Sequence, residues 1–309
     1  MEEQSVRLKT LPIAERGSKV KLEHLAPAAT PLSGFLERLP HLLVADQLRA
    51  VVAGVVAARR AGRPVLFTMG AHVIKCGLAP VLIDLARRGI ITAFATNGAT
   101  LVHDSELALF GETSEDVEQG LRDGTFGMGE ETHSFVNGAI RDGVLRGEGL
   151  GESVGRALLA ANAPHAEISL LAQCAALSIP LTVHVAIGTD VLHMHSTADG
   201  AALGEGSLRD FHRLFGTVSN LAGGALLNVG SAVILPEVLL KAFSMHRNQG
   251  GNLDGCVCAD FDMIRNYRTT TQVVNRVRIL GGEGHALTGH HEIMVPLLAG
   301  LLLAELGER

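Results

Sequence analysis

The sequence reads PVLFTMGAHVIKCGLAPVLIDLARRGIITAFATNGATLVHD from Pro64 to Asp104, and this stretch decides the predicted fold. Residues 65–67 are an uninterrupted apolar run, as expected for a strand that is covered on both faces. Thr68, Met69 and Gly70 follow as a turn, and residues 71–88 then carry apolar side chains at close to helical spacing. Strand, glycine-containing turn and helix in this order predict a βαβ unit of a parallel sheet.

A second turn of the same kind follows the next predicted strand. Residues 90–95 supply that strand, and Thr96-Asn97-Gly98-Ala99 make the turn. Both turns lie at the carboxyl end of a strand and the amino end of a helix, where backbone N–H groups and the helix dipole attract phosphate or carboxylate. We therefore expect a pocket for a phosphate-bearing ligand at this edge. The alternative stays open that these are ordinary turns, because every parallel α/β protein needs them.

Strands and helices alternate along the rest of the chain. Further strands are predicted at residues 180–185, 225–228, 255–260 and 273–280. This alternation predicts an α/β fold with a doubly wound, mostly parallel sheet and helices on both faces. Residues 1–43 mix charges with prolines and are predicted to be an N-terminal arm, whereas residues 44–309 are predicted to form a single α/β domain of the dinucleotide-binding type.

The bulk properties narrow the class of protein. A formal charge of −6 disfavours nucleic acid as a partner, since nucleic-acid binding needs clustered Lys and Arg. No apolar run reaches the length of a bilayer span, and the amino terminus lacks the hydrophobic core of a signal peptide. The four cysteines are sparse, and Cys256 and Cys258 are expected to be buried free thiols on one face of a strand. We therefore expect a cytoplasmic protein.

Residues 186–207, AIGTDVLHMHSTADGAALGEGS, are the loop richest in chemically active side chains. Asp190, His193, His195 and Asp199 offer the nitrogen and oxygen donors that zinc or iron accepts. No nearby element supplies a third metal ligand at a regular spacing, so we favour polar contacts with a substrate or cofactor over a metal site. His290 lies in a similar position before the last helix, and we name His193, His195 and His290 as candidate acids or bases.

A hydrolase motif is also present in outline. Residues 151–155, GESVG, fit the GxSxG pattern, but a nucleophile elbow needs a strand leading into the serine, and here a charged, glycine-rich stretch precedes it. We interpret Ser153 as a helix cap. The glycine-rich stretch itself, residues 123–153, is expected to be a mobile lid or short helices joined by loops over the site.

Four segments resemble deoxyhypusine synthase and its bacterial relatives, in the same order along the chain. They are TMGAHVIKCGLAPVLIDLARRGIITAFATNGATLVHD, IPLTVHVAIGTD, ALLNVGSAVILPEVLLKAF and TGHHEIMVPLLAGLL. The resemblance implies a six-stranded, parallel, NAD-binding Rossmann-like fold, a homotetramer and NAD-dependent oxidation of a polyamine. Carried over by position, it implies that the dinucleotide contacts Thr68, Gly70, Thr96, Gly98, Asp190, Gly230 and Gly289.

This sequence departs from that family at the residues that carry the family's chemistry. The family forms a covalent intermediate on a lysine in a Trp-Gly-Lys segment, and here the corresponding segment reads VVNRVRIL, residues 273–280. The chain has no lysine after Lys241 and no tryptophan, and Ile234-Leu235-Pro236 replace the family's histidine-bearing turn. Arginine cannot act instead of lysine because its guanidinium stays protonated. Deoxyhypusine synthesis by the covalent route is therefore not expected.

Three classes of function remain. The first is an NAD-dependent enzyme that acts on a small amine or amino acid without a covalent lysine, with one of the three histidines as acid or base. The second is a non-catalytic relative that binds a metabolite or only assembles. The third is a metal-dependent lyase or hydrolase that uses the His193-Met194-His195 loop. The first is favoured, with a small-molecule substrate and a homo-oligomer as its expected partners.

Overall fold

The six-stranded sheet at the centre of the molecule is parallel throughout. The computed structural model describes residues 9–24 and 32–308. The sheet has the strand order β5-β3-β2-β6-β7-β8. Its strands are β2 (Val65–Met69), β3 (Ala93–Asn97), β5 (Leu181–His184), β6 (Ala225–Val229), β7 (Val257–Asp262) and β8 (Glu283–Thr288). The α/β fold class with a parallel sheet is confirmed.

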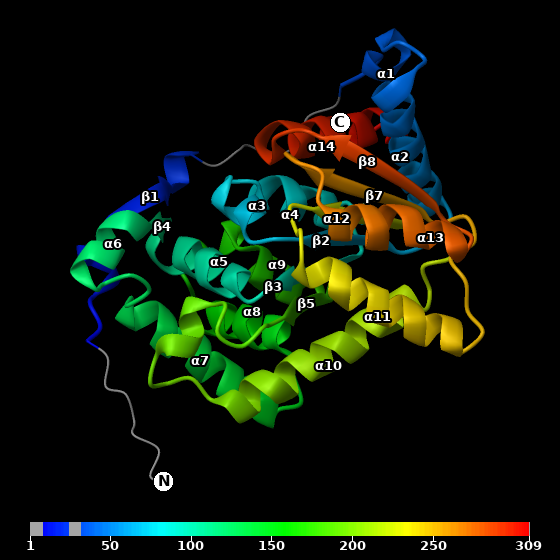
Figure 1. The fold of residues 1–309 in the computed structure, drawn as a ribbon. Coiled ribbons are helices and arrows are strands. Elements are labelled where there is room, and N and C mark those ends of the chain that lie inside the picture. The colour runs from blue at the N-terminus through cyan, green and yellow to red at the C-terminus, as the bar shows by residue number, and fades with distance from the viewer. Residues whose placement is uncertain (1–8, 25–31, 309) are drawn as a thin grey trace.

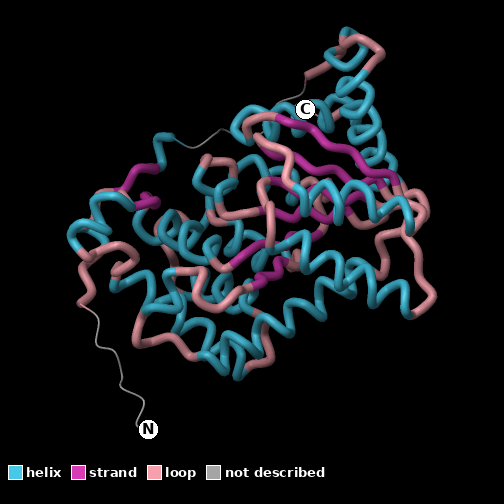
Figure 2. Tube along the Cα trace, in the orientation of Figure 1, coloured by secondary structure: helices cyan, strands magenta, loops and turns pink. Residues whose placement is uncertain are grey.

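Helices cover both faces of the sheet (Figures 1 and 2). On one face lie α2 (Leu43–Arg60), α3 (His72–Lys75), α4 (Ala79–Arg87), α5 (Ala99–Phe110), α8 (Leu150–Ala160), α9 (Leu170–Leu177) and α14 (His291–Leu306). On the other lie α10 (Gly200–Val218), α11 (Ile234–Asn248), α12 (Tyr267–Thr269), a π-helical segment η5 (Thr270–Asn275) and α13 (Arg276–Ile279). The remaining helices are α1 (Phe35–Arg38), α6 (Val117–Asp123) and α7 (Glu130–Leu145), with short 3-10 turns η1 (Ile13–Glu15), η2 (Leu22–His24), η3 (Ala166–Ile168) and η4 (Val191–Met194).

Successive side chains of β2 point to opposite faces of the sheet, and both faces are buried. Val65, Phe67 and Met69 point into the core under α2, α4 and α14, whereas Leu66 points into the core under α10 and α11. All five residues of the strand are buried. Because both faces are apolar, the strand has no polar alternation, and this is the property that made it visible in the sequence.

The arm described for residues 9–24 lies outside the main sheet. It contributes β1 (Ser18–Lys21), which pairs antiparallel with β4 (Glu112–Glu115) in a separate two-stranded sheet. Residues 112–115 form β4, and Asp116, which follows them, caps α6. Part of the predicted arm, residues 1–8 and 25–31, lies outside the described residues.

The sixth strand was placed wrongly from the sequence. Residues 273–280 were predicted to be a strand, but residues 273–279 belong to η5 and α13, and the sixth strand is β8, which follows them. The β-branched Val273 and Val277 suggested a strand, yet they lie four residues apart and both pack into the core beside α11, which is helical spacing. Tertiary packing therefore decided this segment.

Several boundaries also differ from the predicted ones. The helix predicted over residues 71–88 is split into α3 and α4 at Gly77, whose φ is +74°. Thr96 and Asn97 belong to strand β3, so the turn begins at Gly98. Helix α10 begins at Gly200 with Asp199 as its cap, which shortens the polar loop after β5.

The glycine-rich stretch 123–153 is mostly one long helix. Residues 130–145 form α7, and α8 begins at Leu150 with Gly149 at its N-cap. Ser153 is therefore not a cap: it lies inside α8, and its hydroxyl donates to the carbonyl of Gly149 at 2.6 Å. The backbone N–H of Gly151 instead donates to the buried carboxylate of Asp210, at 3.2 Å.

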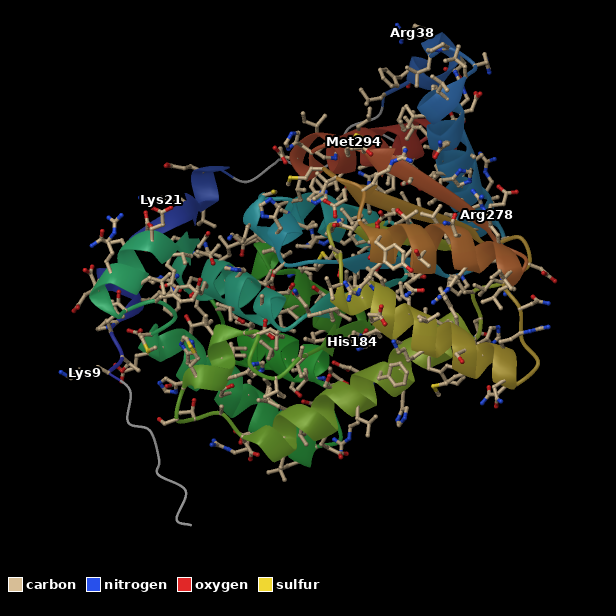
Figure 3. The ribbon with its side chains drawn as sticks, in the orientation of Figure 1. Lys9, Lys21, Arg38, His184, Arg278 and Met294 are labelled. Atoms are coloured by element: carbon tan, nitrogen blue, oxygen red, sulfur yellow. The ribbon has the colours of Figure 1, made fainter. Side chains whose placement is uncertain are left out.

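His184 gives the fold a pH dependence that can be measured. It is buried at the end of β5 near the middle of the molecule (Figure 3), and burial lowers its pKa from 6.5 to about 4. The unfolded chain takes up this proton at a higher pH than the folded protein does, so stability is complete above the unfolded pKa and is lost as the pH falls toward the folded one. From about pH 7 to about pH 5, His184 should cost about 2 kcal/mol.

We expect that His184→Gln flattens this part of the stability profile. The measurement is urea unfolding of wild type and variant at both pH values, because glutamine does not titrate. Exposed His212, on α10, provides a control: His212→Gln should leave the wild-type profile unchanged. A His184→Gln profile parallel to that of wild type would contradict the prediction.

Candidate functional site

The strand order defines one place where ligands are expected to bind. Numbered along the chain, the six strands lie in the order third, second, first, fourth, fifth, sixth. The direction of the chain across the sheet therefore reverses between β2 and β6. In open sheets of this order, ligands bind in the crevice outside the carboxyl ends of the strands at this switch point. The chain at that edge follows β2 at Gly70 and β6 at Gly230.

Gly70 and Gly230 touch each other at the switch point. The N–H of Gly70 donates to the carbonyl of Val229 at 3.1 Å, and a Cβ on Gly70 would overlap the carbonyl oxygen of Gly230. Gly230 has a φ of +64°, and a Cβ there would lie 2.5 Å from Nε2 of His291. Both glycines are therefore required by packing within the protein, as well as by any ligand that approaches the edge.

Gly98, after the neighbouring strand β3, lies under a carboxylate. A Cβ on Gly98 would overlap Oδ2 of Asp190, which extends from the loop after β5. Burial raises the pKa of Asp190, while His193 and the backbone N–H of Ala99 partly offset that rise. Oδ2 is buried and accepts no hydrogen bond from the described residues. A buried acceptor thus stands at the amino end of α5.

A polar ladder crosses three strands just inside the edge. Thr68 donates from its hydroxyl to Oδ1 of Asn228 at 2.9 Å, and Nδ2 of Asn228 donates to Asp260 at 2.7 Å and to the carbonyl of Ser231 at 3.0 Å. The three side chains lie on aligned positions of β2, β6 and β7. Burial raises the pKa of Asp260. The ladder fixes the loop after β6 by bonding Ser231.

His291 lies beside the switch point, although it follows β8 at the far side of the sheet. It begins α14, which crosses back over β7, and its ring lies 6.0 Å from that of the exposed His72. Its side chain is buried, Nδ1 has no hydrogen-bond partner among the described residues, and burial lowers its pKa. His290, which was predicted instead, is exposed and 3.8 Å from Glu292.

The other two predicted histidines lie at the opposite end of the edge, after β5. Nδ1 of His193 accepts the N–H groups of Gly188 and Asp190, so this ring closes the turn. His195 is half-buried, and its ring stacks on that of His133 from α7, with centroids 5.3 Å apart. His193 and His195 therefore follow β5, the strand at one edge of the sheet, whereas His290 follows β8, the strand at the other edge.

The remaining predicted cofactor residues are placed as follows. The hydroxyl of Thr96 is buried and donates to the carbonyl of Met69 at 3.1 Å, so it links β3 to β2. Gly289 follows β8 and packs against Met294 near the start of α14 (Figure 3). Thr68 acts within the ladder. The hydroxyls of both threonines are thus engaged inside the protein.

The structure bears on the metal ligands and on the free thiols that were considered from the sequence. Across residues 9–24 and 32–308, no group of three or more His, Cys, Asp and Glu side chains could hold a metal ion. Cys256 and Cys258 are buried free thiols 3.7 Å apart in the core beside α11. Of the helices in the described ranges, none combines the length and the apolarity that a membrane crossing needs.

Sequence reasoning missed His72, His291, Asn228, Asp260 and His133. His72 and Asn228 carried a signal, since both lie close to the carboxyl end of a buried strand, the first after β2 and the second in β6. The approach of His291 to Gly230 could not be seen, because it depends on the path of α14 across the sheet.

Together, the strand order and the edge define an α/β fold of the Rossmann type. Solved structures share it. Unliganded AgrE superposes with a TM-score of 0.52 at 20% identity, over 84% of this chain and 32% of that chain. The ternary complex of AgrE with ornithine and NAD+ gives 0.51 at 19% identity, with 84% and 32% covered.

ArgZ, an arginine dihydrolase from the ornithine-ammonia cycle in cyanobacteria, gives a TM-score of 0.50 at 18% identity, with 84% of this chain and 31% of that chain covered. This chain thus spans about a third of the length of these structures. No family model and no curated protein matches the sequence. At such identities the likeness establishes the fold alone.

Proposed function

We propose that the protein binds NAD at the carboxyl edge of the sheet and acts on a small amine or amino acid without a covalent lysine. One observation carries the proposal: two buried polar atoms that lack partners among the described residues, Oδ2 of Asp190 and Nδ1 of His291, flank the contact between Gly70 and Gly230. Asp190 lies against Gly98, which follows β3, and His291 lies against Gly230, which follows β6. These strands are on either side of β2, so the two atoms are separated by about two strand spacings, roughly 10 Å. An extended polar ligand suits that span.

The donors and acceptors at this edge fit NAD. A carboxylate close to the end of the second strand is the group that binds ribose hydroxyls in folds of this kind, and Asp190 takes that place beside Gly98. Gly70 and Gly230 let the backbone come close to the ligand, and His291 offers a neutral ring nitrogen next to them. When bound, NAD would supply a hydride acceptor.

For the acid or base we propose His195 ahead of His193 and His290. The ring of His193 is held by two backbone N–H groups, and His290 is exposed, 3.8 Å from Glu292. His195 is half-buried and so is reachable from solvent, and Thr197 orients its Nδ1 at 2.8 Å. Its Nε2 is the atom that would exchange a proton with the substrate.

The wider assignment is also a proposal. The resemblance to the deoxyhypusine synthase family supports a homotetramer in the cytoplasm that shares the family's fold and lacks its lysine chemistry. Exposed apolar side chains gather on the loops at the carboxyl ends of the strands, as a subunit interface requires: Ile187, Val233, Met263, Ile264 and Tyr267. The mass in solution, measured by light scattering, tests this state.

NAD is expected to raise the melting temperature of the purified protein. A ligand that binds the folded state at about a hundred times its Kd adds about 2.7 kcal/mol, which is several degrees for a domain of this size. Differential scanning fluorimetry with NAD provides the measurement, and nicotinamide alone provides a control without phosphate or ribose. A melting temperature that does not change with NAD would refute the cofactor assignment.

A further inference from the structure

Arg16 lies in the N-terminal arm, and two of its three guanidinium nitrogens have no hydrogen-bond partner among the described residues. Its side chain is only 8% exposed, and Nη1 donates to Oε1 of Glu106 on α5 at 2.8 Å. Nε and Nη2 are both buried and have no partner among the described residues. Since the Nε–H and one Nη2–H point the same way, they present the two parallel donors that a carboxylate accepts. Burying the Nε–H and Nη2–H groups without acceptors costs free energy, and a carboxylate bound there would recover it.

His133, at the start of α7, borders the same glycine, Gly129, as Arg16 does. Its side chain is 1% exposed, and Nδ1 donates to the carbonyl of Gly129. Burial lowers its pKa, so the ring is neutral and Nε2 carries a lone pair. Nε2 is also buried without a partner in the described parts of the chain. The ring therefore offers an acceptor, and its Cε1 lies, like Nη1 of Arg16, within 4 Å of one point, the Cβ position of Gly129.

Gly129 lies between these two side chains. The position that a Cβ would take on Gly129 is 3.6 Å from Nη1 of Arg16 and 3.9 Å from Cε1 of His133. The arm is held here by a hydrogen bond from the N–H of Leu11 to the carbonyl of Met128 at 2.9 Å. Figure 1 shows the arm and its strand β1 at the same end of the molecule as α5 and α7, and Figure 3 places Lys9 and Lys21 on that arm.

The polar loop after β5 closes the other side. His195 stacks on His133, and Asn137 of α7 donates to the carbonyl of Leu192 at 3.2 Å and to Thr197 at 3.1 Å. These bonds attach the loop to α7. Because His195 is only half-buried, the ring of His133 lies one ring away from solvent.

The charges around Arg16 favour a zwitterion over a simple anion. Glu106 and Glu115 both lie on the Nη1 side, at 2.8 Å and 3.8 Å. Two carboxylates and one guanidinium leave a negative balance that would repel acetate, whereas the ammonium of an amino acid offsets it.

From these contacts we propose that Arg16 and His133 bind an α-amino acid. Its carboxylate accepts hydrogen bonds from Nε and Nη2 of Arg16, and its ammonium donates to Nε2 of His133. This inference rests on the proposed function only in choosing an amino acid over a simple amine. It places the amino-acid backbone beside His195, the proposed acid or base.

Isothermal titration calorimetry without NAD tests the site, with L-ornithine and putrescine as a matched pair that differs by the carboxylate. We expect L-ornithine to bind wild type, and putrescine and acetate to bind at least about tenfold more weakly, since neither offers both groups. Gly129→Ala puts a methyl group between Arg16 and His133 at ordinary contact distances, and should weaken L-ornithine at least about tenfold while the protein stays folded.

Gly138→Ala is the control variant. Gly138 lies in the same helix with nothing within 4 Å of its Cβ position, so this variant should bind like wild type. Equal binding of L-ornithine to wild type and Gly129→Ala, binding of putrescine as tight as that of L-ornithine, or no binding of L-ornithine would each overturn the inference. Because the titrations omit NAD, the dinucleotide proposal stands or falls separately, by its own melting measurement.

Discussion

Asp104→Ala is expected to lower the free energy of unfolding by about 3–5 kcal/mol. Asp104 is fully buried on α5 and accepts hydrogen bonds from the hydroxyl of Ser169 at 2.5 Å and from the backbone of Leu170 at 2.9 Å and Leu171 at 3.0 Å. It thereby satisfies the amino end of α9. Alanine would leave these donors buried without acceptors. Urea unfolding near neutral pH measures the loss.

A second carboxylate cap shows how much of this effect comes from burial. Asp199 accepts from Ala201 at 2.9 Å and Ala202 at 3.1 Å at the start of α10, but it is half-exposed, so water can replace it. Asp199→Ala should cost about 1 kcal/mol. Similar losses for the two variants would show that the bonds of Asp104 contribute no more than an ordinary cap.

Protonation of Asp104 is part of the same prediction. Burial raises its pKa from 3.8 to about 6, with the three hydrogen bonds working against the rise. A raised carboxyl pKa contributes stability that is complete below the unfolded pKa and is lost as the pH rises through the folded one. The difference between wild type and Asp104→Ala should therefore be larger at about pH 4 than at about pH 7.

Asp190→Asn is expected to weaken NAD binding by about 10- to 100-fold, because a hydrogen bond to a charged group contributes about 1.5–3 kcal/mol. Wild type should also prefer NAD over NADP, since the carboxylate of Asp190 would repel a phosphate on the ribose that it contacts. Asparagine removes the repulsion, so the variant should discriminate less between the two dinucleotides. Titrating wild type and Asp190→Asn with NAD and with NADP gives the four dissociation constants.

Asp199→Asn is the matched control for this experiment. It makes the same chemical change in the same loop and keeps an oxygen at the cap of α10, where asparagine is as good as aspartate. Its NAD affinity should equal that of wild type. If Asp190→Asn also bound like wild type, or if wild type bound NADP as well as NAD, Asp190 would have no role at the ribose.

The elements that the sequence predicted correctly are those that depend on residues close together in the chain. Strands β2 and β6 were visible because they are short apolar runs. Residues 273–280 misled because valines suit both a strand and a buried helix. Ser153 misled because a serine before an apolar run is typical of a cap, whereas Asp210, distant in sequence, already accepts the Gly151 N–H.

For the candidate site too, the local sequence indicated where the turns lie but not which side chains meet there. The turns at Gly70 and Gly98 lie on one edge, as the βαβ pattern requires, since all parallel strands end on the same side. The pattern could not tell that Asp190 covers Gly98 or that His133 stacks on His195. These contacts join segments that are far apart along the chain.

The sequence by itself determined a parallel α/β sheet with glycine turns at the carboxyl ends of its strands, because apolar runs and turn residues act over a few neighbouring positions. The tertiary structure alone decided which polar groups meet there. His291 reaches Gly230 because α14 crosses the sheet, and Arg16 reaches Glu106 because the arm pairs with the body. Such contacts depend on the packing of whole elements.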